Sequence, residues 1–126
     1  MDFSLTEEQE MLQKTTRDFL ATECPKKLVR EMAKDEIGHP LELWQKMSEV
    51  GWLGLIIPEQ YGGSGASFFE LVVLLEEMGR ACLPGPFFST VVLGGLTLLA
   101  GGSNEQKEEL LPELAQGKLL LTLALT

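Results

Sequence analysis

Residues 87–100 read FFSTVVLGGLTLLA, fourteen residues without a charge, and this stretch decides the fold class. A segment that is apolar all round is either a membrane span or a helix inside a core. It falls short of the roughly 20 residues that a span needs, so a core helix is predicted. Gly94 and Gly95 each cost a helix roughly 1 kcal/mol relative to alanine. Their presence indicates close approach of another backbone or of a ligand.

Turn and capping signals on both sides of this stretch predict five further helices. The first begins near Thr6, where either Thr6 with Gln9 or Ser4 with Glu7 forms a capping box. A second capping box, Ser67 with Glu70, begins a helix that is mostly buried and ends at Gly79. The predicted helices, including the charge-free one, span about 6–24, 26–36, 43–50, 67–79, 87–100 and 103–117. The glycines at 62–65 indicate a turn.

The last nine residues, KLLLTLALT at 118–126, predict a strand that is apolar on both faces. Six helices offer it no partner, and a lone strand leaves its backbone groups unpaired. We therefore expect an all-α, orthogonal-type bundle of about six helices (1–117), with one terminal β-strand (118–126) leading into a missing β domain. Pairing of that strand between copies, or disorder, are the alternatives.

Composition excludes several classes of protein. The chain has 126 residues, 44% hydrophobic and 23% charged, which is ordinary for one globular domain. Its 10 Lys and Arg against 19 Asp and Glu give a net charge of -9, which argues against nucleic-acid partners. No stretch is long enough to span a membrane, and the acidic start is unlike a secretion signal. Cys24 and Cys82 have neither a disulfide framework nor metal-ligand spacing, so a reducing, cytoplasmic setting without metal is expected.

Eight segments, taken in order, resemble one family over essentially the whole chain. Each is weak alone, but the ordered set is specific. They are FSLTEEQ with RDFL at 3–20, WQKMSEVGWLGL at 44–55, PEQYGGSG at 58–65, EEMGR at 76–80, GSNEQK at 102–107, LPELAQG at 111–117 and LALT at 123–126. Together they resemble the N-terminal helical domain of the acyl-CoA dehydrogenases. In that family Glu-Pro usually follows the final Thr, and this chain lacks it.

The resemblance implies a flavoenzyme of three parts: this helical domain, a β domain and a C-terminal helical bundle. FAD is held mainly by the latter two and by a neighbouring subunit. A proton and a hydride leave adjacent carbons of an acyl-CoA, which gives a 2,3-enoyl-CoA, and an electron-transfer flavoprotein or similar acceptor takes the electrons. The catalytic base lies in the C-terminal bundle, so no residue of this chain is nominated as catalytic. We expect the chain alone to be inactive and to bind FAD weakly or not at all.

Two sets of residues match the family's binding positions. The terminal strand passes the flavin, which gives Thr126 as a hydroxyl partner of the ring, with Leu123 and Leu125 as apolar neighbours. The charge-free helix lines the acyl pocket, and its candidates are Pro86, Phe87, Ser89, Thr90 and Leu93. The bulky LPGPFF stretch at 83–88 leaves a branched or ring-bearing acyl group open. For both sets, ordinary core packing is the alternative.

Other functions remain open alongside the dehydrogenase. The chain could belong to a non-catalytic assembly subunit of a hetero-oligomeric dehydrogenase, or to a related acyl-CoA oxidase or flavin monooxygenase. The homo- or hetero-oligomeric state and the acyl chain are not fixed by the sequence. His39, between Gly38 and Pro40, is expected in a turn rather than in catalysis.

Overall fold

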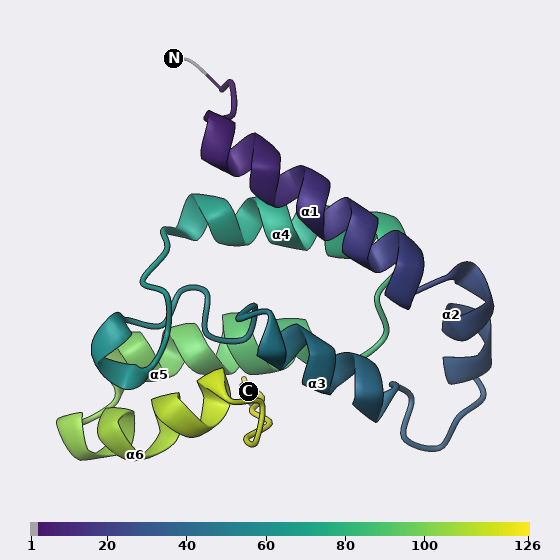
Figure 1. The fold of residues 1–126 in the computed structure, drawn as a ribbon. Helices are drawn as coiled ribbons and strands as arrows, with labels where there is room; N and C mark the ends of the chain where they lie inside the picture. The colour runs from purple at the N-terminus through teal and green to yellow at the C-terminus, as the bar shows by residue number, and fades with distance from the viewer. Residues whose placement is uncertain (1–2) are drawn as a thin grey trace. The chain divides into compact units, whose positions relative to one another are not determined.

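A computed structural model describes residues 3–126 and is all-helical over this range, as predicted. Its helices are α1 (Glu7–Glu23), α2 (Lys26–Met32), α3 (Leu41–Glu49), η1 (Glu59–Tyr61), α4 (Phe68–Ala81), η2 (Phe88–Gly95), α5 (Leu96–Gly101) and α6 (Asn104–Ala115) (Figure 1). They form two compact units. The residues up to Gly38 with Ser67–Pro84 are called the α1–α4 unit, and His39–Ala66 with Gly85–Thr126 the tail unit. None of these helices could cross a bilayer.

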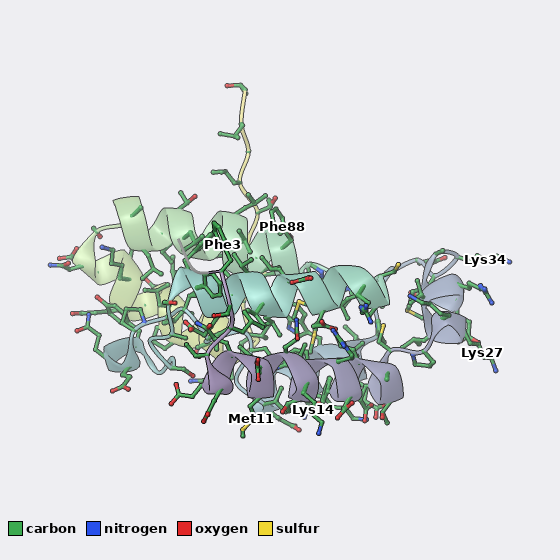
Figure 2. The ribbon with its side chains drawn as sticks, turned by 90° about the horizontal axis from the view of Figure 1, so that it is seen from above. Phe3, Met11, Lys14, Lys27, Lys34 and Phe88 are labelled. Carbon is green, nitrogen blue, oxygen red and sulfur yellow. The ribbon has the colours of Figure 1, made fainter. Side chains whose placement is uncertain are left out.

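In the α1–α4 unit, two long helices lie side by side (Figure 1). The predicted capping boxes are present, Thr6 with Gln9 and Ser67 with Glu70. Gln9 Nε2 also donates to Glu70 Oε1 at 2.8 Å, so both caps are joined. Farther along, Arg17 contacts Glu77, which shows that the two helices run in the same direction. Figure 2 shows Met11 and Lys14 on the side of α1 that faces away from α4.

Three predictions about this unit were wrong. α4 passes through Gly79 and ends at Ala81, because Cys82 takes the left-handed cap position with φ 55°. The helix was predicted to be mostly buried, but it exposes Phe68 and Val72, which are 59% and 43% exposed. α2 ends at Met32, before the predicted end at residue 36, and a polar turn follows it.

The tail unit contains α3, η1, η2, α5 and α6. Its α3 buries Leu43, Trp44 and Met47, whereas Val50, just beyond the helix, is exposed. Trp44 Nε1 donates to the carbonyl of Gly117 at 2.9 Å, which ties α3 to the end of α6. The other fully buried side chains of this core include Leu53, Ile57, Val91, Leu111 and Leu114.

The glycine-rich segment at 62–65 is a turn, as predicted. Its amides are used internally: Ser64 N–H donates to the carbonyl of Gly54 at 2.9 Å and Gly65 N–H to that of Ile57 at 2.8 Å. A Cβ on Gly63 would lie 2.0 Å from the Ile57 oxygen. The turn therefore needs glycine for close backbone packing.

The strand predicted for 118–126 is not formed, and this segment, called the tail below, has neither helix nor strand. The reason is the missing partner: no other extended segment in residues 3–126 supplies a ladder of backbone hydrogen bonds. The tail keeps one feature of a strand, because residues 119–124 alternate between half-buried and exposed. The domain boundary at 117/118 stays a prediction.

Candidate functional site

The charge-free helix forms as predicted, but its first half has an unexpected winding. Phe88–Gly95 is a π-helix, and the α-helix α5 follows from Leu96. π-Helical turns are rare and occur often at functional sites. Ordinary helical periodicity does not anticipate this wider winding, which changes the directions in which the side chains of η2 point.

One side chain of η2 holds the tail. The Thr90 hydroxyl accepts a hydrogen bond from Leu121 N–H at 3.2 Å and donates one to the Leu121 carbonyl at 3.3 Å. Thr90 is completely buried. A single hydroxyl therefore satisfies both backbone groups of one tail residue, as a neighbouring strand would.

Gly94 makes room for the same tail residue. A Cβ on Gly94 would lie 2.3 Å from Leu121 Cβ, closer than two carbon atoms can approach. The sequence indicated close approach of a backbone or a ligand at Gly94, and the structure places the side chain of Leu121 there instead. Gly95 differs, because its nearest neighbour would be Leu114 Cδ1 at an ordinary 3.5 Å.

A cavity of about 330 Å³ lies beside this contact. Gly94, Leu98, Leu110, Leu121 and Leu123 give it a largely apolar wall, so it suits a hydrocarbon group better than a charged one. Its remaining lining residues are Thr97, Gly101, Gly102, Gln106 and Thr122.

The predicted acyl-site residues lie along the helix or, for Pro86, just before it, in different environments, and none of them lines this cavity. Phe87 and Thr90 are buried, and the Thr90 hydroxyl is already occupied by Leu121. Pro86, Ser89 and Leu93 are half-buried, and the Ser89 hydroxyl donates to the Pro86 carbonyl at 3.1 Å. Phe88, which was not nominated, is 54% exposed and lies on the outside of η2 (Figure 2).

The predicted flavin-contacting residues lie in the outer half of the tail. Leu123 belongs to the cavity wall, whereas Leu125 is 83% exposed and Thr126 is also exposed. Within residues 3–126, backbone hydrogen bonds hold the tail only at Lys118, whose N–H donates to the Glu113 carbonyl at 2.9 Å, and at Leu121. The backbone of residues 122–126 is therefore available to a ligand or to another segment.

A second hollow, of about 360 Å³, lies within the α1–α4 unit. Beside it Arg17 makes a two-point ion pair with the buried Glu77, at 2.7 Å from Nη2 to Oε1 and 3.0 Å from Nε to Oε2. The hydrogen bond from Arg17 lowers the pKa of Glu77, against burial, which raises it. Both charges are thus committed to each other. The segment EEMGR at 76–80 contributes to the family resemblance, but its sequence does not indicate that Glu77 is buried.

No metal site is found in the described part of the chain, since no three His, Cys, Asp or Glu side chains gather there. Cys24 is buried and its pKa is raised by that burial, which keeps the thiol protonated. His39 packs edge-on against Trp44, with ring centroids 6.2 Å apart, which agrees with a structural role.

Comparisons with known proteins agree with this architecture. The sequence profile of "Acyl-CoA dehydrogenase, N-terminal domain" matches residues 6–118. A protein named acryloyl-CoA reductase (NADH), from Anaerotignum propionicum, is 37% identical over the whole chain, which covers 32% of that protein. The chain thus spans about a third of the length of the curated relatives it matches.

Two solved structures resemble this one. The ChsE4–ChsE5 complex from Mycobacterium tuberculosis superposes with a TM-score of 0.87 at 30% identity, over 97% of this chain and 34% of that one. An acyl-CoA dehydrogenase complexed with FAD from Bacillus anthracis gives 0.81 at 31% identity, over 94% of this chain and 21% of that one. Because the profile match covers most of the residues, the chain belongs to the acyl-CoA dehydrogenase family and corresponds to its N-terminal helical domain.

Proposed function

We propose that this chain is the N-terminal domain of an FAD-dependent acyl-CoA dehydrogenase, which forms a 2,3-enoyl-CoA from an acyl-CoA. The observation that carries the proposal is the arrangement of η2 and the tail. A helix without charges supplies an apolar wall, and an extended segment held on that helix presents free backbone groups beyond it. The family match and the FAD-bound relative support this assignment.

The tail has the chemistry to meet a flavin. Leu123 and Leu125 can contact an apolar ring face, while Thr126 and the free backbone of 122–126 can donate to or accept from a polar ring edge. FAD, when bound, would accept the two electrons of the oxidation. In this chain the tail would orient that group, and Pro86, Phe87, Ser89, Thr90 and Leu93 would shape the acyl side. Each buried methylene of an acyl chain contributes about 0.8 kcal/mol against such a wall.

The full-length polypeptide, purified and given acyl-CoA thioesters without oxygen, tests the reaction. We expect the visible flavin band to bleach and the thioester to lose two hydrogen atoms, as mass spectrometry would record. Residues 1–126 alone should do neither. Absence of bleaching with every straight-chain, branched and ring-bearing thioester would refute the dehydrogenase assignment. An electron-transfer flavoprotein and oxygen are then compared as acceptors, which separates a dehydrogenase from an oxidase.

The tail's role has its own test in two matched threonines. Thr126→Val removes the hydroxyl proposed to meet the ring, and Thr122→Val removes a hydroxyl from the same tail, also exposed. We expect the first change to raise the Kd for FAD by about fivefold, the value of one hydrogen bond, and the second to leave it unchanged. Equal effects would show that the Thr126 hydroxyl does not touch the flavin.

A second candidate is an assembly subunit that completes the site of a different subunit. The similarity to a chain of the ChsE4–ChsE5 complex favours it. Its signature would be a full-length protein that binds no FAD alone but restores acyl-CoA oxidation when mixed with a co-expressed partner. The similarity to an acryloyl-CoA reductase (NADH) adds the reverse reaction to the assay, measured as NADH consumption with an enoyl-CoA.

A further inference from the structure

We propose that Thr90 is a positioning residue, whose hydroxyl, with the space at Gly94, sets the register of the tail. The pair is called the clamp below. By fixing Leu121, the clamp determines where Leu123, Leu125 and Thr126 lie. Only the consequence for flavin binding rests on the proposed function, which places those three residues against the flavin.

The clamp replaces a strand partner. The tail has no ladder, yet Leu121 has both its N–H and its carbonyl bonded to one hydroxyl, at 3.2 and 3.3 Å. A threonine in a helix commonly bonds a carbonyl one turn earlier in its own helix. Thr90 is instead directed at a residue 31 positions away, and it is completely buried there. Replacing it without another acceptor and donor would leave the two part-buried backbone groups of Leu121 unpaired.

Gly94 selects which tail residue enters the clamp. The Cβ of Leu121 occupies the space that any side chain at position 94 would fill. Because successive side chains of an extended segment point to opposite faces, a slip by one residue would turn every tail side chain over. It would also move Thr126 by about 3.3 Å along the tail. The clamp therefore determines which side chains face outward from the unit and how far they reach.

The test compares single substitutions in the full-length polypeptide. Thr90→Val keeps the shape of the side chain and removes the hydroxyl, Thr90→Ser keeps the hydroxyl, and Thr15→Val makes the same change at an exposed position of α1, in the other unit. Amide hydrogen exchange across 119–125, FAD affinity and the visible spectrum of the bound flavin are measured for each.

We expect Thr90→Val to speed exchange of the Leu121 amide about tenfold or more, since the part-buried hydrogen bond that protects it is lost. It should also raise the Kd for FAD and shift the flavin spectrum. Thr90→Ser should restore all three values, and Thr15→Val should leave them unchanged. Rescue by serine separates positioning by the hydroxyl from a general loss of packing.

Two further substitutions, which change only the space around the tail, test the clamp if Thr90→Val fails to fold. Gly94→Ala would push on Leu121 without touching the hydroxyl, whereas Gly95→Ala places the same methyl at an ordinary contact distance. Faster tail exchange in the first and not in the second supports the clamp. Unchanged exchange in both Thr90→Val and Gly94→Ala would overturn it, whether or not the protein binds FAD.

The two proposals fail separately. Faster tail exchange in Thr90→Val with unchanged FAD affinity and flavin spectrum would overturn the positioning role, while acyl-CoA oxidation by the unsubstituted protein would still support the proposed function. An unsubstituted protein that binds no FAD would overturn the proposed function. In that case the proposed effect of the clamp on flavin binding is overturned as well. Hydrogen exchange still tests whether the clamp sets the register of the tail.

Discussion

The two units of this domain satisfy their polar groups in different ways. In the α1–α4 unit, most long-range contacts join two side chains, Gln9 to Glu70 and Arg17 to Glu77, although Lys26 Nζ also donates to the Arg80 carbonyl. In the tail unit, side chains bind backbone, as Trp44 does at Gly117 and Thr90 at Leu121. The first arrangement depends on which side chains face each other, and the second on how closely backbone segments approach.

Glycines make the same difference visible. Gly79, inside α4, has no atom within 4 Å of the place where a Cβ would be. In the tail unit, added Cβ atoms would lie 2.0 Å from the Ile57 oxygen at Gly63 and 2.3 Å from Leu121 Cβ at Gly94. A methyl group is therefore a small change at Gly79 and a large one at Gly63 and Gly94.

Gly63→Ala should have the largest effect. The new methyl meets backbone atoms of Ile57 and Gly54, which cannot turn aside as a side chain can. We expect the free energy of unfolding to fall by about 3 kcal/mol, the upper range for overpacking. Because both tryptophans, Trp44 and Trp52, lie in the tail unit, urea unfolding followed by tryptophan fluorescence measures it there.

Gly79→Ala is the matched control for that substitution. Alanine replaces glycine inside a helix with open space around it, so we expect a gain of about 0.5 kcal/mol from the reduced freedom of the unfolded chain. Similar losses of stability for Gly63→Ala and Gly79→Ala would show that the chain is not packed more closely around Gly63 than around Gly79.

Glu77→Gln should have the next largest effect, in the other unit. The amide keeps the size of the side chain but loses the charge that Arg17 binds through two hydrogen bonds. We expect the free energy of opening, measured by hydrogen exchange at the α1 and α4 amides, to fall by about 2 kcal/mol, as for loss of a hydrogen bond to a charged group. Glu76→Gln, next to it and exposed, should change protection little.

The effect of Glu77 should depend on pH in a defined direction. Its pKa is lowered in the folded state by the hydrogen bond from Arg17. The stabilisation is therefore complete above the unfolded carboxyl pKa of about 4.3 and is lost as the pH falls through the lower folded value. The difference between the unsubstituted protein and Glu77→Gln should shrink on acidification. A constant difference from neutral to strongly acidic pH would contradict the charged pair as its source.

Local signals predicted local structure well. The capping boxes at Thr6 and Ser67 both form, because each involves groups only three residues apart. The charge-free stretch is helical, and the close approach at Gly94 follows from the presence of glycine in a helix. The end of α4 was misplaced because Cys82, rather than a glycine, takes the left-handed position.

Features that need two distant segments could not be predicted. Glu77 is buried because α1 brings Arg17 to it, and no spacing in the sequence shows which helices are neighbours. The role of Thr90 depends in the same way on the tail lying across η2. Sequence reasoning named Thr90 for the acyl site, whereas its hydroxyl is used by Leu121. The cavity beside the clamp was missed for the same reason, since α5, α6 and the tail form it together.

Thr16→Val should have the smallest effect of the three, and it should stabilise. Thr16 is completely buried on α1, and its hydroxyl has no hydrogen-bond partner among the described residues. Valine has the same shape without the unpaired oxygen, so we expect protection of the α1 amides to rise by about 1 kcal/mol. Thr15→Val, at the neighbouring exposed position, controls for helix propensity and should change protection little. If Thr16→Val instead lowers protection, a bound water satisfies the hydroxyl, and the α1–α4 unit would then contain a polar contact beyond its side-chain pairs.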